Sequence, residues 1–257
     1  MLSPVSSATA KPAEFPGFAI CRGLGRQATL AAAASSVRQT FARGKTLFSE
    51  GHQADNIYEV ALGTLRLHKL LKDGRRQITA FPTAGQLLGL ARDGLYLHSA
   101  EAITEVTVRC YSRAGFSRLV EHVPGFRQRL MVTISDELRA AQDRMLLLGK
   151  KTAIEKVASF ILQLANCGGT GNRGRVQMPM IGPDIADYLG LTPETVSRAF
   201  SELQHERKIE RPSISRLRIL DRYQLENCAA GSAQNLRRCG FSAGKVIQLR
   251  QKTLWST

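Results

Sequence analysis

Short apolar runs separated by glycines fill the chain between about Gly44 and Arg113. Short runs of this kind, bounded by glycine turns, are typical of β-strands. Asp73-Gly74 stands between two such runs and is typical of a hairpin turn. The predicted strands are Thr46–Phe48, Ile57–Ala61, Thr64–His68, Gln77–Phe81 and Glu105–Tyr111. Many short strands at this spacing predict a small antiparallel barrel or sandwich.

The period then changes to that of a helix. From Phe126 to Gly149 apolar residues recur every three or four positions, which predicts an amphipathic helix about 36 Å long. Its apolar stripe comprises Phe126, Leu130, Ile134, Leu138, Ala141, Met145 and Leu148. The periodicity is equally compatible with packing on its own domain and with pairing to the same helix of a second copy. A capping-box pattern at Thr152 and Glu155 starts another helix, and a strand is expected at Val176–Met180.

Two further helical patterns are joined by a glycine in residues 182–201, GPDIADYLGLTPETVSRAFS. Pro183 and Pro193 suit first helical turns, because proline lacks the N–H that has no partner there. Gly190 supplies the left-handed backbone that a sharp turn requires. Ala186 is small enough for the two helices to cross closely. The stretch is typical of a helix-turn-helix that inserts its second helix into the major groove of DNA.

The second helix of this motif presents a polar face near its N-terminal end, where recognition helices carry their base-reading residues. Arg198 suits a bidentate contact with guanine, and Glu194 can accept a hydrogen bond from cytosine. The predicted DNA-binding residues are Thr192, Glu194, Thr195, Ser197 and Arg198, with Thr192 also able to cap the helix. A purely structural helix pair would need the glycine and the apolar face, but not this outward set. Strands expected at Ile209–Arg211 and Leu217–Leu220 would form a wing.

The composition of the chain indicates what kind of partner it binds. The chain of 257 residues has a formal net charge of +15 and a pI near 10.2, which favours a polyanionic partner. Part of this charge lies in residues 229–257, which hold five basic residues and no acidic one. That extension either adds attraction to phosphates or has no role. Since the chain lacks both a membrane-spanning apolar run and the apolar core of a signal peptide, we expect a cytoplasmic protein with no membrane partner.

The cysteines and other reactive residues form no recognisable catalytic or metal-binding pattern. Five cysteines without a C-x-x-C pair indicate neither a disulfide framework nor a zinc site. H-E-x-x-H, G-x-S-x-G and Walker patterns are also missing, so we expect no catalytic residues, no metal and no other cofactor. Cys110 alternates with Val106 and Val108 and is predicted to be a small buried hydrophobe. Cys21 is predicted to be an exposed thiol.

Several of these stretches together resemble the CRP/FNR family of bacterial transcription regulators. KTLFSEGHQADNIYEVALGTLRLHK (residues 45–69) and TAGQLLG (83–89) resemble the family's cyclic-nucleotide-binding-type β-roll. LLLGKKTAIEKVASFILQLA (146–165) resembles the junction between its dimerisation helix and its DNA-binding domain. The outward pattern from Glu194 to Arg198 resembles the FNR-type reading head, and the FixK-like subgroup is the most similar.

The resemblance implies a homodimeric transcriptional activator that binds a TTGA…TCAA palindrome in double-stranded DNA and recruits RNA polymerase. Glu194, Ser197 and Arg198 would read each half-site. Because FixK-like regulators are controlled largely through their own synthesis, under an upstream oxygen-responsive system, the resemblance implies a role in low-oxygen or nitrogen-fixation gene control without a bound small molecule.

Departures from the family pattern bear on the effector. Members that bind cyclic AMP have a Gly-Glu pair and an Arg-Ser pair in the roll, whereas this chain has Gly89-Leu90 and His98-Ser99. A nucleotide phosphate would lack its charged partners, so cyclic nucleotide binding is not expected. Cys110 matches the central cluster cysteine of oxygen-sensing members, but the N-terminal trio is missing, so an iron–sulfur cluster is not expected either. The alternative is a ligand- or redox-gated regulator of the same fold that uses Cys110, Cys21 or an unidentified effector.

One departure concerns the backbone after the recognition helix. Family members usually have a glycine before the wing, where this chain has Glu206-Arg207-Lys208. We therefore expect either an unusual conformation at Lys208 or a different turn.

The chain is thus predicted to have an α+β fold: an N-terminal cyclic-nucleotide-binding-type β-roll, a long dimerisation helix and a C-terminal winged helix-turn-helix. The expected boundaries are a flexible N-terminal tail at 1–24, the β-roll at 25–123, the dimerisation helix at 124–149, the winged helix-turn-helix at 150–228 with its helix-turn-helix at 182–201, and a basic C-terminal extension at 229–257.

Overall fold

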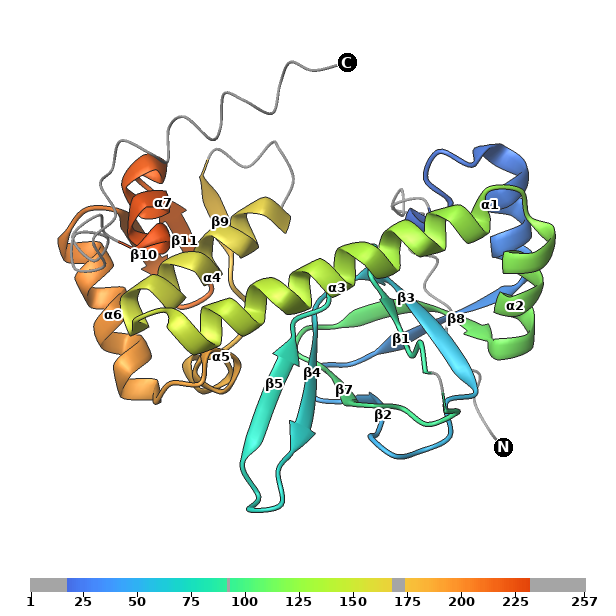
Figure 1. Cartoon of the computed structure of the whole chain (residues 1–257), viewed down its shortest axis with the longest axis horizontal. Helices are drawn as coiled ribbons and strands as arrows, with labels where there is room; N and C mark the ends of the chain where they lie inside the picture. The colour runs from blue at the N-terminus through green and yellow to red at the C-terminus, as the bar shows by residue number, and fades with distance from the viewer. Residues whose placement is uncertain (1–17, 92, 168–173, 232–257) are drawn as a thin grey trace, which may run out of the picture. The chain divides into compact units, whose positions relative to one another are not determined.

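The computed structural model describes residues 18–91, 93–167 and 174–231. Most of the expected N-terminal tail and most of the expected basic extension lie outside these ranges. The described residues form two compact units (Figure 1): one comprises those up to Lys69 together with those of Thr79–Glu137, and the other comprises Leu70–Ile78 together with those from Leu138 onwards. None of the helices in the described ranges is both long and apolar enough to cross a membrane.

Two β-sheets form the predicted β-roll. One has the order β1 (Ser36–Phe41), β8 (Val106–Ser112), β3 (Asn56–Leu62), β6 (Leu87–Leu88), and the other β2 (Thr46–Phe48), β7 (Ser99–Ala102), β4 (Leu65–Leu70), β5 (Arg76–Ala80). All five strands predicted between residues 46 and 111 are present. The sequence pattern did not predict β1, β6 or β7. β1 is an edge strand with both faces largely exposed, so its sequence carries no one-sided alternation.

Apolar side chains of both sheets meet in one core. Phe48 and Leu65 come from one sheet, and Val106, Val108 and Cys110 come from β8 of the other. These β8 side chains are at most 9% exposed, which confirms the predicted alternation and the burial of Cys110.

A second apolar core on the opposite face of β8 is covered by η1 (Ala19–Cys21), α1 (Gly25–Ala34) and α2 (Arg113–His122). The fully buried carboxylate of Glu59 accepts hydrogen bonds from the N–H groups of Ala19 and Ile20 and from the hydroxyl of Tyr111 at 3.1 Å. A buried carboxylate requires such donors. This anchor orders η1, which was expected to lie in a flexible tail, and leaves Cys21 only 3% exposed. The prediction of an exposed Cys21 is therefore wrong.

The long helix predicted after the roll is α3 (Phe126–Lys150), which passes through Gly149 and ends one residue later than expected. Its ends are packed, with Phe126 fully buried and Leu147 8% exposed. Between them lie large apolar residues that are exposed in the single chain: Met131, Val132, Ile134, Leu138, Met145 and Leu146.

The second unit contains the predicted winged helix-turn-helix. Its elements are α4 (Ala153–Cys167), α5 (Gly182–Leu189), α6 (Pro193–His205), α7 (Arg222–Ala230) and a small sheet in the order β10 (Ile209–Ser213), β11 (Arg216–Ile219), β9 (Arg175–Gln177). The N–H of Thr152 donates to Glu155 Oε2 at 3.0 Å, which is one half of the predicted capping box. α4 packs against α6 and α7. β9 is shorter than the strand expected at Val176–Met180.

Candidate nucleic-acid interface

Gly190 makes the turn between α5 and α6. Its backbone is left-handed, with φ +61° and ψ +46°, and the N–H of Leu191 donates to the carbonyl of Ala186 at 3.1 Å. A residue with a Cβ resists this conformation, which is the physical reason for glycine at the turn.

A side-chain cap and a buried face set the orientation of α6. The hydroxyl of Thr192 accepts a hydrogen bond from the N–H of Thr195 at 3.2 Å, and the two hydroxyls are 3.1 Å apart. Val196, Ala199 and Phe200 are between 2% and 3% exposed. Of the residues predicted to contact DNA, Thr192 thus caps the helix with its hydroxyl, and the hydroxyl of Thr195 is hydrogen-bonded to it.

The other three predicted contacts point outward. Glu194, Ser197 and Arg198 are exposed on the first two turns of α6. A hydrogen bond from its own backbone N–H lowers the pKa of Glu194, with smaller contributions from the Thr192 side chain and the charge of Arg198. Glu194 is therefore a carboxylate that can accept a hydrogen bond, while Arg198 offers the donor pair that matches guanine.

The wing is braced against the recognition helix by Arg211. Its guanidinium lies 4.3 Å from the centroid of the Phe200 ring and donates to the carbonyl of Ile214 at 3.4 Å. Burial lowers the pKa of Arg211, yet arginine remains charged at any physiological pH. Arg216 and Arg218 of β11 are exposed on the same hairpin, and Arg218 forms an ion pair with Glu210 at 2.7 Å.

Two alternatives were expected for the turn between α6 and the wing: an unusual backbone at Lys208, or a different turn. The structure shows a different turn. Arg207, not Lys208, has the left-handed backbone, with φ +54°, and it is the one non-glycine residue with positive φ among the described residues. The N–H of Lys208 donates to the carbonyl of Leu203 at 3.0 Å, which closes the helix end. Arg207 is exposed, so its side chain has room in this conformation.

The roll and α3 line a partly open cavity of about 400 Å³. Leu90 and His98, which replace the charged residues of cyclic-AMP-binding members, both line it, together with Phe48, Tyr96 and Ile134. Among the described residues that line the cavity there is no arginine or lysine. The walls therefore suit an apolar group better than a phosphate.

The two candidate redox cysteines are buried in different cores. Burial, reinforced by the nearby charge of Glu59, raises the pKa of Cys21 to about 11, although Arg109 acts in the opposite direction. Its Sγ lies 3.6 Å from the carbonyl of Ala28. Burial also raises the pKa of Cys110. Both environments favour the unreactive thiol over the thiolate.

Two known domains match successive parts of the chain. Residues 155–228 match the Crp-like helix-turn-helix domain, and residues 38–123 match the cyclic nucleotide-binding domain. The chain is 45% identical over 169 residues to the transcriptional activatory protein AadR of Rhodopseudomonas palustris, an alignment that covers 64% of this chain and 70% of that protein. It is 44% identical over 171 residues to the nitrogen fixation regulation protein FixK of Bradyrhizobium diazoefficiens, with 65% and 71% covered.

A solved structure of a FixK protein has a similar fold. FixK2 from Bradyrhizobium japonicum superposes with a TM-score of 0.72 at 35% identity, covering 77% of this chain and 99% of that chain. The chain therefore belongs to the CRP/FNR family of transcription regulators, as a DNA-binding transcriptional activator of the FixK/FNR type.

Proposed function

We propose that two copies of the chain bind a TTGA…TCAA palindrome and that the bound dimer recruits RNA polymerase. Glu194, Ser197 and Arg198 of each α6 read one half-site from the major groove. The observation that carries this proposal is the exposure of all three side chains on one face of a capped helix whose opposite face is anchored in the core. By analogy with relatives named as nitrogen fixation regulators, the target genes belong to nitrogen fixation or low-oxygen metabolism.

The dimer is supported by α3. Apolar side chains that are costly to leave in water, such as Leu138 at 60% and Met145 at 73% exposed, lie along this helix at helical spacing. Pairing with α3 of a second copy would cover them and produce the two-fold symmetry that a palindrome demands. Two recognition helices would then enter successive major grooves about 34 Å apart.

The absence of a cyclic nucleotide from the mechanism is supported by the cavity in the roll. A phosphate there would face Leu90 and His98 without an arginine or lysine from the described lining. The raised thiol pKa values of Cys21 and Cys110 likewise argue against a redox switch at either position. We infer that the dimer is competent to bind DNA without an added effector.

Fluorescence anisotropy of the full-length protein on a TTGA…TCAA duplex and on a scrambled duplex tests this function. Arg198→Ala should cost about 1–3 kcal/mol of binding to the palindrome and relax discrimination at one guanine. Arg222→Ala is the matched control, because Arg222 is an exposed arginine of the same unit that pairs with Glu226 on α7. If Arg198→Ala keeps the wild-type preference for the palindrome, the assignment of Arg198 is wrong.

The second candidate is a ligand-gated regulator, which the apolar cavity of about 400 Å³ favours. In that case the purified protein would bind the palindrome weakly and without selectivity until an apolar effector filled the roll. Selective, tight binding by protein that native mass spectrometry finds free of small molecules would exclude this candidate.

A further inference from the structure

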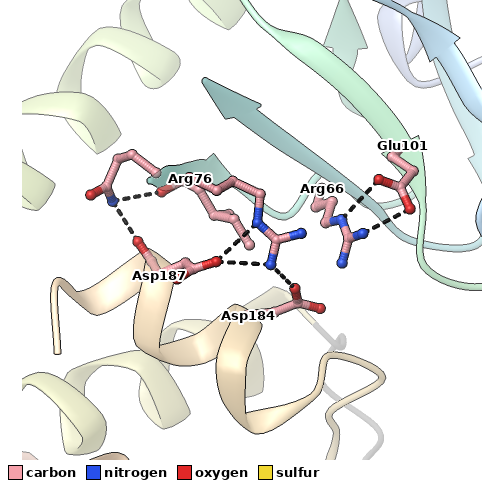
Figure 2. Close-up of polar contacts among 7 residues, drawn as sticks. Arg66, Arg76, Glu101, Asp184 and Asp187 are labelled. Carbon is pink, nitrogen blue, oxygen red and sulfur yellow. Dashed lines mark hydrogen bonds and ion pairs between the residues drawn. The ribbon is translucent and has the colours of Figure 1, made fainter. Parts of the chain in front are cut away.

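α5 is the first helix of the helix-turn-helix, and Arg76 of β5 forms ion pairs with it (Figure 2). Arg76 donates from Nη2 to Asp184 Oδ1 at 2.8 Å and from Nε to Asp187 Oδ2 at 2.9 Å. Gln77 Nε2 donates to the carbonyl oxygen of Asp187 at 2.6 Å. These residues all belong to the second compact unit, because Leu70–Ile78 cluster with it. A single guanidinium thus binds two carboxylates that stand one helical turn apart.

The burial of this network distinguishes it from a surface ion pair. The side chain of Asp184 is 3% exposed, that of Arg76 26% and that of Asp187 32%. Exposed pairs contribute little to stability because water screens them. A carboxylate as buried as Asp184 depends on nearby cations and donors, and loss of one leaves a poorly compensated charge in a low dielectric.

Further contacts make α5 the link to the recognition helix. On one side, the guanidinium of Arg144 in α3 lies 4.5 Å from the centroid of the Tyr188 ring. On the other side, Ile185, Ala186 and Leu189 are at most 1% exposed, and α5 packs against α6. Since close-packed side chains transmit displacement, a shift of α5 moves α6 and the residues that it presents to DNA.

We propose that Arg76 is a positioning residue for DNA recognition: its ion pairs with Asp184 and Asp187 hold α5, and through α5 the recognition helix, in the arrangement that binds the operator. This inference rests on the proposed function. The first helix of a helix-turn-helix crosses the DNA backbone, so Arg76 also neutralises two carboxylates on a helix that approaches phosphates.

Arg66 provides a matched control for this proposal. It lies on β4 and pairs with Glu101 of β7 at 2.7 Å, with side chains 16% and 21% exposed (Figure 2). Arg66→Ala therefore removes the same side chain from a partly buried ion pair whose carboxylate lies on β7 and not on α5. Both variants are prepared in the full-length chain, and anisotropy is measured on the palindrome and on the scrambled duplex.

Arg76→Ala is expected to bind the palindrome about tenfold more weakly than wild type, the scale of coupling by residues that touch neither ligand. Its affinity for scrambled DNA should stay within about twofold, since that binding depends on phosphate contacts. Arg66→Ala should match wild type on both duplexes. Arg76→Lys keeps a cation beside Asp184 and Asp187 and should recover most of the affinity, whereas the uncharged Arg76→Met should bind the palindrome as weakly as Arg76→Ala. Unchanged or stronger binding of Arg76→Ala to the palindrome, or binding of Arg76→Lys as weak as that of Arg76→Ala, would overturn the proposal.

Hydrogen exchange of the DNA-free protein separates failure of this inference from failure of the proposed function. Amides of α5 and α6 should exchange faster in Arg76→Ala than in wild type or Arg66→Ala, whatever base sequence the protein prefers. If wild type shows no preference for the palindrome while exchange changes as expected, the proposed operator is wrong and the role of Arg76 stands. If the amides of α5 and α6 exchange at the same rate in Arg76→Ala as in wild type, the proposed role of Arg76 is wrong, whatever the operator.

Discussion

Replacement of Gly190 by alanine isolates the backbone requirement of the helix-turn-helix. Left-handed backbone costs an alanine about 1–2 kcal/mol relative to its preferred conformation. The added Cβ would lie 3.8 Å from Leu148 Cδ2, an ordinary van der Waals contact, so no clash increases the cost. Alanine also restricts the unfolded chain, which offsets about 0.4–1 kcal/mol. The expected net result for Gly190→Ala is a loss of about 1 kcal/mol in the free energy of unfolding.

Two comparison variants separate the backbone term from steric overlap. Gly63 also has a positive φ, +86°, but a Cβ there would meet the carbonyl oxygen of Glu105. Gly63→Ala should therefore destabilise the protein several times more than Gly190→Ala. Gly190→Asn should cost less than Gly190→Ala, because asparagine tolerates left-handed backbone better than other residues with a Cβ.

Circular dichroism during heating measures this series, and a loss of about 1 kcal/mol lowers Tm by about 2–4 °C in a chain of this size. Because two units need not unfold together, hydrogen exchange of α5 and α6 serves as the local readout. The reasoning fails if Gly190→Ala leaves both quantities unchanged. It also fails if Gly190→Ala is as damaging as Gly63→Ala, since steric overlap would then dominate at both sites.

Two other predictions concern features that the local sequence pattern did not reveal. Arg207→Gly should raise Tm, because glycine relieves about 1–2 kcal/mol of backbone strain at φ +54°. The greater entropy of glycine in the unfolded chain offsets only part of this gain. An unchanged or lower Tm in a thermal scan would show that the turn is not strained. Cys21 should react with iodoacetamide at pH 8 far more slowly in the folded protein than in urea, because a thiol with a pKa of about 11 is ionised in only about one molecule in a thousand at that pH. Mass spectrometry of the alkylated peptides measures both rates, and equal rates would contradict the burial of Cys21.

The roll of this chain has the architecture of the cyclic nucleotide-binding domain that its sequence matches. Its cavity persists, but Leu90 and His98 stand at the positions where a phosphate would need charged partners. If the protein binds DNA without a ligand, as proposed, its DNA-binding unit obtains its orientation from contacts within the protein. The ion pairs of Arg76 are contacts of this kind, which is why their removal is an informative test.

Features governed by neighbours a few residues apart followed from the sequence alone. Gly190 and the Thr192 cap were predicted because turns and caps are closed by hydrogen bonds to residues three to five positions away. The long helix and the face of β8 that carries Cys110 were predicted because side-chain periodicity reports which face is buried. The sequence alone therefore determined the two-part α+β architecture and the outward direction of Glu194, Ser197 and Arg198.

Only the tertiary structure decided the features that depend on distant partners. Cys21 is buried because the carboxylate of Glu59, about 40 residues further along the chain, binds the backbone of η1. Arg76 reaches Asp184 across 108 residues, and no spacing within either segment indicates the pair. β1 acquires its place by pairing with β8 rather than by its own alternation. Such contacts form because folding brings together charges and strand edges that are far apart in the sequence. A pattern among neighbouring residues does not indicate which distant residues will meet.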